Sequence, residues 1–372
     1  MLDLAWTENA GRPRDDLALD FTPEVERPKA ACSRPDNDII NAINQEEAQM
    51  KTLTGIITAV ALAVSAPLAT ARDFRSADIH PADYPTVEAV KFMGKQLAAA
   101  SGGKLGVKVF PNGALGSEKD TIEQLKIGAL DMMRINASPL NNFVPETIAL
   151  CLPFVFRDTQ HMRAVLDGPI GDEILAAMAP AGLVGLAYYD SGARSIYTVK
   201  APVKSLADLK GLKIRVQQSD LWVGMIQSLG ANPTPMPYGE VYTALKTGLV
   251  DAAENNWPSY ESSRHFEAAK FYNITEHSLA PEVLVMSKKV WDTLSKDDQA
   301  MIRKAAKESV PVMRKLWDER EQASRKTVEA AGVQVVTIAN KAEFVDAMKP
   351  VYQKFAGDEK LQSLVKRIQD AK

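Results

Sequence analysis

The amino-acid sequence predicts an α/β protein built from two lobes. From Phe74 onward, segments with strand patterns alternate with segments of helical period. About 300 residues follow the N-terminal region, which is twice the usual size of one domain. Alternating strands and helices favour parallel sheets, in which ligands bind at the carboxyl ends of the strands.

The N-terminal region is expected to lie outside this fold. Residues 1–49 show no apolar period and are rich in Pro, Asp and Arg, so we interpret them as a disordered extension upstream of the native start. Residues 50–71 have the parts of a secretory signal peptide: a basic residue, an apolar run over residues 53–64, and the cleavage pattern Ala69-Thr70-Ala71. The apolar run is too short for a membrane span, which needs about 20 residues. We expect a periplasmic protein that begins near Arg72.

The expected mature chain is close to neutral. Residues 1–71 hold 11 acidic and 6 basic side chains, so removing them changes the formal charge from −3 to +2. This balance suits an anionic small molecule and gives no support for nucleic-acid binding. Cys151 is then the only cysteine, so no intramolecular disulfide is expected. Its apolar neighbours indicate a buried side chain and not a nucleophile.

The first half of the mature chain alternates strands and helices. Apolar patterning predicts a helix from about Tyr84 to Ala100, ended by Ser101-Gly102-Gly103. Pro111-Asn112-Gly113 predicts a turn before a second helix, with Ser117 as its N-cap. The expected strands are residues 74–78, 105–109, 130–135 and 183–189.

The second half continues the alternation. Residues 209–256 predict the order strand, helix, strand, helix, strand. From Ser295 to Ala331 the pattern is helical for more than 30 residues. Pro311 lies inside this stretch and is expected to kink or interrupt the helix, because it has no amide hydrogen and its ring clashes with the preceding turn. Two consecutive helices are the alternative.

Arg215 lies in the middle of an apolar strand, between Ile214 and Val216. A guanidinium there needs a strong partner, and its planar fork fits a carboxylate through two parallel hydrogen bonds. The partner is either the carboxylate of a ligand or a protein carboxylate in a structural ion pair.

Several motifs in order resemble the substrate-binding proteins of TRAP transporters, the DctP family of periplasmic receptors for small organic acids. They are GLKIR ending at Arg215, GANPTPMPYGEVYTALKTGLVDAAENN from Gly230, FPNGALGSEKDTIEQLKIGALDM from Phe110, LPFVFRD from Leu152 and LDGPIGDEI from Leu166. The resemblance covers the chain from Arg72 to near the C-terminus.

This resemblance implies a two-lobe periplasmic substrate-binding protein fold, with hinge strands and a long helix that spans both lobes. Lobe I is expected to comprise residues 72–192 and 281–320, and lobe II residues 193–280 and 321–372. It also implies a receptor, expected to be a monomer, that delivers its ligand to TRAP transporter membrane subunits.

The resemblance assigns roles to residues near a ligand carboxylate. Arg215 is the carboxylate clamp, and Arg194 and Asn255 lie near the same carboxylate. Two arginines around one anion are tolerated only with that anion present, since like charges repel in a partly desolvated cleft. Tyr238 matches an aromatic position that lines the pocket. The alternatives are an ion pair for Arg194 and ordinary packing for Tyr238.

Further candidates surround these four. Asn136 matches a position at which sialic-acid-binding members have a glutamate that contacts ligand. Asp78 and His80 follow the first strand, where family members often offer polar groups, although a lone histidine is more often structural. Gln217 and Trp257 border the motif residues and are weaker candidates for ligand contact.

Three segments resemble the branch of the family that binds D-glucuronate and D-galacturonate: SADIHPADYPTVEAVKFMG, YYDSGARSIY and KIRVQQSDLW. A uronate has one carboxylate and a ring of hydroxyls, which suits an Arg/Arg/Asn site with neutral polar groups and an aromatic wall. A C4-dicarboxylate needs a second cationic anchor, and none is evident. Another organic acid (a C4-dicarboxylate, sialic acid or an aldonate) is the alternative within the same receptor class.

An enzyme is not expected. Ser101-Gly102-Gly103-Lys104, Lys246-Thr247-Gly248 and Ser219-Asp220 resemble motifs of penicillin-recognising serine hydrolases. However, Ser101 ends a helix where the nucleophile should open one, and Leu221 replaces the required asparagine. The four histidines show no metal-ligand spacing, and no phosphate-binding glycine loop is present. We therefore expect a binding protein without a metal, a cofactor or a nucleic-acid partner.

Overall fold

The structure is a computed structural model, and it describes Gln45, Met50 and residues 71–372. The chain divides into two units, Met1–Leu68 and Ala69–Lys372. In the first unit, Gln45 and Met50 are helical. The expected extension and almost all of the expected signal peptide lie outside the described residues, so both stay predictions. Within the described part of the chain, no helix is long and apolar enough to cross a bilayer.

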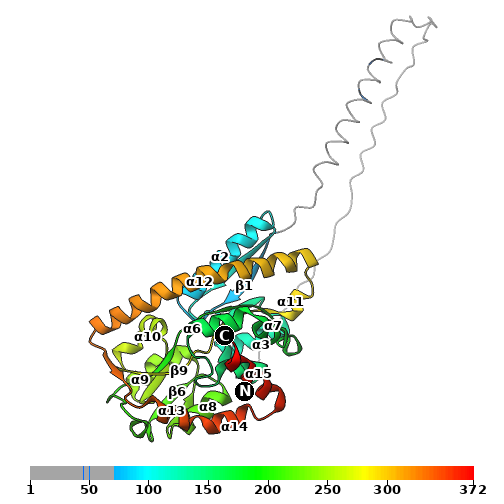
Figure 1. Cartoon of the computed structure of the whole chain (residues 1–372). Coiled ribbons are helices and arrows are strands. Elements are labelled where there is room, and N and C mark those ends of the chain that lie inside the picture. The colour runs from blue at the N-terminus through cyan, green and yellow to red at the C-terminus, as the bar shows by residue number, and fades with distance from the viewer. Residues whose placement is uncertain (1–44, 46–49, 51–70) are drawn as a thin grey trace, which may run out of the picture. The chain divides into compact units, whose positions relative to one another are not determined.

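Two sheets organise the second unit (Figure 1). The first sheet contains, in spatial order, β2 (Leu105–Phe110), β1 (Arg72–Ala77), β3 (Met132–Asn136), β10 (Glu282–Ser287) and β4 (Leu183–Tyr189). The second sheet contains β11 (Gln334–Thr337), β9 (Phe271–Ser278), β5 (Arg194–Thr198), β8 (Ala252–Asn255), β6 (Lys213–Val216) and β7 (Asn232–Pro235). The predicted α/β class is confirmed.

Neither sheet is purely parallel, which corrects the expectation from the sequence. β1 runs parallel to β2 and β3, but β10 is antiparallel to β3 and β4. Likewise β6 runs parallel to β7 and β8, but β5 is antiparallel to β8 and β9. The reason is connectivity, because the chain leaves the first sheet from β4 to β5 and returns from β9 to β10. These two connections lie side by side, since Tyr189 pairs with Glu282 and Arg194 with Ser278.

Helices connect the strands, and their boundaries agree closely with the sequence patterns. Ser117 caps α3 by accepting a hydrogen bond from the Asp120 amide, and the Asp120 carboxylate accepts one from the Ser117 amide. The helices up to β10 are α2 (Pro85–Ala100), α3 (Glu118–Ile127), α4 (Ala137–Leu140), α5 (Ile148–Cys151), α6 (Thr159–Asp167), α7 (Pro169–Ala176), α8 (Asp220–Ser228), α9 (Val241–Thr247) and α10 (Trp257–Ser262). After β10 come α11 (Lys288–Trp291), α12 (Lys296–Ala330), α13 (Lys341–Ala347), α14 (Lys349–Phe355) and α15 (Glu359–Asp370). Single 3-10 turns occupy Pro145–Thr147, Ala179–Ala181, Leu206–Leu209, Tyr238–Glu240 and His265–Glu267.

One long helix contacts elements of both sheets. α12 has 35 residues and packs along α2 and β4 and then against α10 (Figure 1). Arg320, in the second half of this helix, contacts Asp83, which precedes α2, and Glu261 of α10. The helix continues through Pro311, so the alternative of two consecutive helices is wrong. Packing of its buried face, which includes Met313 and Trp317, offsets the hydrogen bond that proline cannot make.

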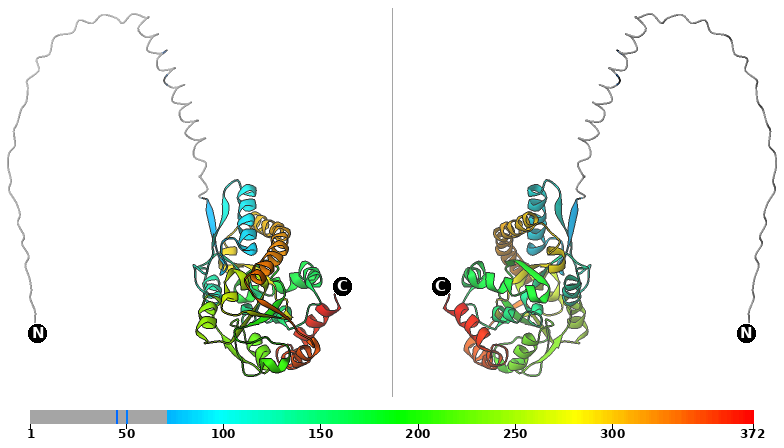
Figure 2. Two further views of the ribbon diagram at one scale, coloured as in Figure 1. Left: turned by 90° about the vertical axis from the view of Figure 1, so that its left-hand side faces the viewer. Right: turned by 90° about the vertical axis from the view of Figure 1, so that its right-hand side faces the viewer.

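Apolar clusters fix the position of each sheet. Phe74, Met93 and Trp317 belong to a cluster that joins the first sheet to α2 and α12. A second cluster fills the space beneath β5, β8 and β9. The largest cluster includes Ile135 of the first sheet and Ile214 of the second, and the C-terminal helices complete it. In the side views, β1 and α2 lie at the opposite end of this unit from the C-terminal helices (Figure 2). Cys151 is fully buried in the largest cluster, and burial raises the pKa of its thiol to about 11.

Candidate functional site

Strand ends from both sheets meet at one small, charged cavity. The carboxyl ends of β1, β3, β6 and β8 contribute to it, together with the amino ends of β5 and β10. Its volume is about 10 Å³, which is room for about one water molecule. It is lined by Ile79, His80, Glu118, Arg134, Asn136, Arg194, Arg215, Gln217, Tyr238, Asn255, Ser259 and Glu282.

Seven of the nine residues predicted from the sequence line this cavity. They are Arg215, Arg194, Asn255, Tyr238, Asn136, His80 and Gln217. Asp78 and Trp257 do not line it. The seven lining residues lie in, or directly after, six different strands, so only the fold brings them together.

Arg215 is buried and has no carboxylate partner. Its side chain is 2% exposed, and its Nε and Nη2 atoms both donate to the carbonyl of Met236, at 3.1 and 2.7 Å. No carboxylate among the described residues lies within ion-pair distance of it, and its Nη1 atom makes no hydrogen bond to them. Burial lowers the pKa of Arg215, because the carboxylate of Glu254 is too remote to compensate fully. The alternative of a structural ion pair is therefore wrong for Arg215.

Arg194 is a buried ion pair, unlike Arg215. Its Nε and Nη2 atoms donate to the two carboxylate oxygens of Glu254 at 2.6 and 2.8 Å. Burial alone would lower the pKa of Arg194, but the Glu254 carboxylate raises it above the ordinary value. Its Nη1 atom donates to Oδ1 of Asn255 at 2.8 Å. The expectation that the two arginines need a ligand anion to coexist is wrong for Arg194, because Glu254 neutralises it.

A third buried arginine was missed in the sequence. Arg134 in β3 is 1% exposed and is paired with Asp78 on one side and with Glu282, at 2.7 Å, on the other. Asp78 thus holds Arg134 in place instead of facing the cavity. The signal that singled out Arg215, an arginine within an apolar strand, is also present at Arg134, between Met133 and Ile135.

Glu118 is the second lining residue that sequence reasoning missed. It is the first residue of α3, is 8% exposed, and its Oε1 atom has no hydrogen-bond partner among the described residues. Burial raises the pKa of its carboxyl to about 7, although Arg134 nearby opposes the shift. As a glutamate in the first turn of a capped helix, it looked like an ordinary solvated residue.

Three aromatic rings lie in contact at one side of the cavity. They come from segments that follow strands of both sheets. The His80 ring stacks on Tyr84 with 3.8 Å between centroids and meets Tyr238 edge-on at 5.2 Å. The Tyr84 hydroxyl bonds to the Ser259 hydroxyl at 2.8 Å, and the Tyr238 hydroxyl donates to the Ser259 carbonyl. Burial lowers the pKa of His80 well below its ordinary value, so its ring is neutral at pH 7.

Three neutral side chains supply the remaining polar groups. Asn136 caps α4 through Ser138 and donates to Oε1 of Glu282 at 3.1 Å. Asn255 accepts hydrogen bonds through Oδ1 from Arg194 and from the Asn256 amide, which leaves its Nδ2 atom unbonded to described residues. Gln217 is 6% exposed and its Oε1 atom has no partner among them. The cavity therefore offers both donors and acceptors without further charge.

Trp257 lies in the core beside the site and not in it. Its ring stacks on Tyr272 with 3.6 Å between centroids, and it belongs to the apolar cluster beneath the second sheet. Arg325 covers its other side at 5.4 Å. Proximity in sequence to Asn255 suggested ligand contact, but the start of α10 at Trp257 turns the side chain into the core.

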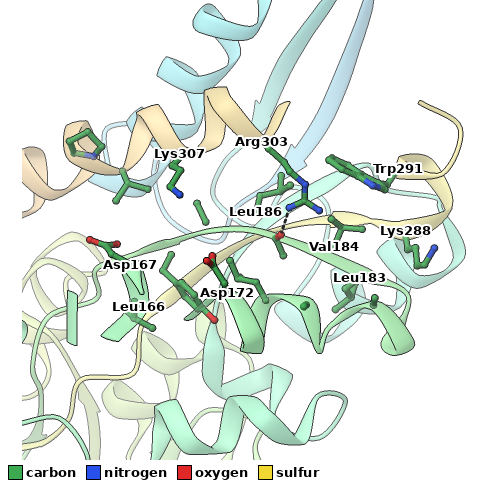
Figure 3. Close-up of a pocket in the computed structure, with 18 of the residues that line it drawn as sticks. Leu166, Asp167, Asp172, Leu183, Val184, Leu186, Lys288, Trp291, Arg303 and Lys307 are labelled. Atoms are coloured by element: carbon green, nitrogen blue, oxygen red, sulfur yellow. Dashed lines mark hydrogen bonds between the residues drawn. The ribbon is translucent and has the colours of Figure 1, made fainter. Parts of the chain in front are cut away.

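A much larger cavity lies elsewhere in the described part of the chain (Figure 3). It has a volume of about 740 Å³ and lies between β4, α7, α11 and α12, and it shares no residue with the charged cavity. Arg303 bonds to the Gly185 carbonyl across it, while Lys288 pairs with Asp292 and Arg314 with Asp167. Size favours this cavity as a ligand site. The smaller cavity remains the candidate site, because three of its lining residues, His80, Glu118 and Gln217, have buried polar atoms without a hydrogen-bond partner among the described residues.

Comparison with known proteins identifies the class of the chain. Residues 76–358 match the sequence profile of DctP, described as bacterial extracellular solute-binding protein, family 7. A solute-binding protein of Chromohalobacter salexigens is 41% identical over 320 residues, which cover 86% of this chain and 94% of that protein. These matches define an extracellular solute receptor.

Solved structures agree in fold. A TRAP periplasmic solute binding protein from Bradyrhizobium sp. BTAi1, in complex with α/β-D-galacturonate, is 95% identical, with a TM-score of 0.80 over 81% of this chain and 100% of that chain. A second, from Xanthobacter autotrophicus Py2 with bound β-D-galacturonate, is 59% identical, with a TM-score of 0.79 and the same coverage. The chain belongs to the DctP family and is a TRAP transporter solute-binding protein. The resemblance inferred from the motifs, and the periplasmic-binding-protein type of fold, are confirmed.

Proposed function

We propose that the protein binds a hexuronate, D-galacturonate or D-glucuronate, in the charged cavity and delivers it, as a periplasmic monomer, to the membrane subunits of its transporter. Solved relatives at 95% and 59% identity hold galacturonate, and one from Pseudomonas putida F1 at 44% identity holds D-glucuronate. The protein acts as a receptor and not as an enzyme. No group of three or more His, Cys, Asp or Glu side chains in the described residues could hold a metal ion.

The uncompensated charge of Arg215 is the observation that supports this function most directly. A buried guanidinium without an anion is costly, and a ligand carboxylate at its free Nη1 atom removes that cost. The free Nδ2 atom of Asn255 supplies a further donor. Arg194 then acts beside the carboxylate as a positioning residue for Asn255, since its own charge is balanced by Glu254.

The rest of the cavity suits the hydroxyls and ring of a sugar acid. Glu118, Glu282 and Gln217 offer acceptors, and the half-buried Tyr238 offers an aromatic wall. Arg134 is a second cation, but Asp78 and Glu282 already neutralise it, so it does not favour a dicarboxylate.

Ligand entry requires the two sheets to separate. A cavity of about 10 Å³ cannot admit a sugar, so a hexuronate enters an open form and the lobes close around it. Lobe I comprises residues 72–192 and 281–320 and lobe II residues 193–280 and 321–372, so the adjacent links from β4 to β5 and from β9 to β10 form the hinge.

A thermal-shift screen of the purified protein tests this function. Galacturonate or glucuronate at about a thousand times its dissociation constant should add about 4 kcal/mol of stability and raise the melting temperature by several degrees, whereas succinate, sialic acid and erythronate should not. Arg215→Ala should lose about 2–5 kcal/mol of binding free energy, and Arg215→Lys should also bind poorly, because an ammonium group cannot reproduce the planar fork.

Lys213→Ala is the matched control, since Lys213 lies on the same strand but is exposed. It should bind like the wild type. Uronate binding by Arg215→Ala at wild-type affinity would show that the carboxylate binds elsewhere.

A further inference from the structure

Glu118 is the only carboxylate lining the charged cavity that has no ion-pair partner among the described residues. Glu282 is paired with Arg134, but no cation of the described residues lies within ion-pair distance of Glu118. Glu118 lines the cavity, is 8% exposed, and its Oε1 atom has no hydrogen-bond partner among those residues. The N-terminus of α3 favours its ionised form by only about 0.3–1 kcal/mol.

The formal charges around the cavity sum to zero without Glu118, because three guanidinium groups stand against three carboxylates: Arg134, Arg194 and Arg215 against Asp78, Glu254 and Glu282. They are unevenly paired, since Arg134 holds two carboxylates and Arg215 has none among the described residues. A bound uronate adds one negative charge to this set. An ionised Glu118 would add a second negative charge in a closed space from which water is excluded, and like charges there raise the free energy steeply.

We propose that Glu118 is a neutral carboxylic acid in the ligand-bound receptor, so that uronate binding at neutral pH takes up one proton. This inference rests on the proposed function and deepens it. The proton binds to a carboxylate oxygen of Glu118, and the O–H group then donates a hydrogen bond to a ligand oxygen. In the open form water reaches Glu118, which is ionised at pH 7, so the proton comes from solvent when the lobes close.

The groups that face Glu118 do not supply this proton. Arg134 of β3 and Arg215 of β6 lie near it and favour its ionised form, while Glu282 of β10 favours the neutral one. His80, in the loop after β1, is neutral already because burial lowers its pKa, so it has no proton to give.

Other titratable groups lie farther away or point elsewhere. On α3 itself, Asp120 is bonded to Ser117 and Lys119 lies outside the lining. His277 Nε2 lies 3.6 Å from the Glu254 carboxylate and is not in the cavity lining. The Tyr238 hydroxyl donates to Ser259, and burial raises its pKa, so it stays protonated.

Isothermal titration calorimetry with galacturonate tests the proposal. Titrations at pH 8 in two buffers of different ionisation enthalpy should report an uptake of about one proton per ligand, and affinity should fall by up to about tenfold per pH unit between pH 7 and 9. Glu118→Gln should take up no proton and bind with an affinity that does not change with pH. Glu123→Gln, an exposed acid of the same helix, is the matched control and should behave like the wild type.

Two results would overturn the proposal. The first is binding by the wild type at pH 8 without proton uptake, which would mean that an ionised Glu118 is tolerated beside the bound ligand. The second is uptake that persists in Glu118→Gln, which would move the proton to another group such as Asp78. If Glu118→Gln no longer binds galacturonate, the number of protons that the wild type takes up on binding still tests the proposal. Absence of galacturonate binding at both pH 6 and pH 8 would instead contradict the proposed function.

Discussion

At the scale of single residues, two buried arginines that look alike in the sequence have different roles. Arg194 and Arg215 are each 2% exposed, yet Arg194 has both oxygens of Glu254 and Arg215 has only a backbone carbonyl. Removing one partner of a buried ion pair destabilises the fold, because the other charge is then left uncompensated. A buried charge without an ion-pair partner is instead available to bind a ligand of opposite charge. Partners, and not burial, distinguish the two.

This difference predicts opposite effects on stability. Arg194→Ala should lower the free energy of unfolding by about 3–5 kcal/mol, because the buried Glu254 carboxylate loses both guanidinium hydrogen bonds and keeps only the more distant His277 ring, at 3.6 Å, among the described side chains. Arg215→Met should leave the free energy of unfolding of the ligand-free protein unchanged or raise it, because it removes an uncompensated charge, while it abolishes uronate binding. Urea unfolding monitored by circular dichroism measures both. Equal destabilisation by the two substitutions would contradict the assignment of roles.

Residue-level prediction from the sequence succeeded where a side chain conflicts with its local pattern. Arg215 was predicted as a site residue because it is an arginine inside an apolar strand. Arg134 shows the same feature in the sequence but was not predicted. Glu118 gave no such signal, because a glutamate in the first turn of a helix is favourable on local grounds alone. The charged groups that act on it, Arg134, Arg215 and Glu282, lie on three other elements, β3, β6 and β10.

At the scale of elements, the link between β4 and β5 depends on a glycine. Gly192 has φ = +61°, and a Cβ atom there would lie 2.6 Å from Glu321 Oε1 and 3.2 Å from the Trp317 ring of α12. Any side chain at this position would therefore require Glu321 or Trp317 of the long helix to move. The sequence motif YYDSGAR matched the family, but it did not show which helix covers the glycine.

Gly192→Ala should accordingly lower the free energy of unfolding by more than the strain of its left-handed backbone conformation alone. Gly248→Ala is the matched control, since Gly248 has φ = +75° and no atom within 4 Å of the added methyl. The control should lose about 1–2 kcal/mol of unfolding free energy from left-handed strain, and Gly192→Ala should lose more because Glu321 or Trp317 must also move. Chemical denaturation of the two variants gives the comparison, and equal losses would show that the contact relaxes freely.

At the scale of the whole molecule, pH acts on stability through acids that folding buries. Burial raises the pKa of Glu321 in α12 to about 7 from 4.5, and the nearby Asp318 and Asp190 add to the shift. Because the folded-state pKa is the higher one, the stabilisation is complete below about pH 4.5 and is lost as the pH rises through 7. Above that range the ionised, half-buried carboxylate of Glu321 opposes folding.

Glu321→Gln should therefore raise the melting temperature at pH 8 and leave it unchanged at pH 4. The amide keeps the shape of the side chain but cannot ionise, so the difference between variant and wild type isolates this one titration. Differential scanning fluorimetry across this pH range makes the measurement. A variant that melts at the wild-type temperature at pH 8 would show that solvent reaches Glu321 in the folded protein.

The sequence by itself determined the α/β class, the approximate bounds of the elements with clear patterns, such as α2, β4 and α12, and the family, because each depends on local periodicity, capping and motifs that a linear chain displays. It also determined seven residues that line one cavity. Only the tertiary structure decided the mixed direction of both sheets, the pairing of Arg194 with Glu254, the isolation of Arg215 and the burial of Glu118. These features depend on which side chains from distant strands are buried next to one another. The free energy of a buried charge is set by the groups around it in space and not by its neighbours in sequence.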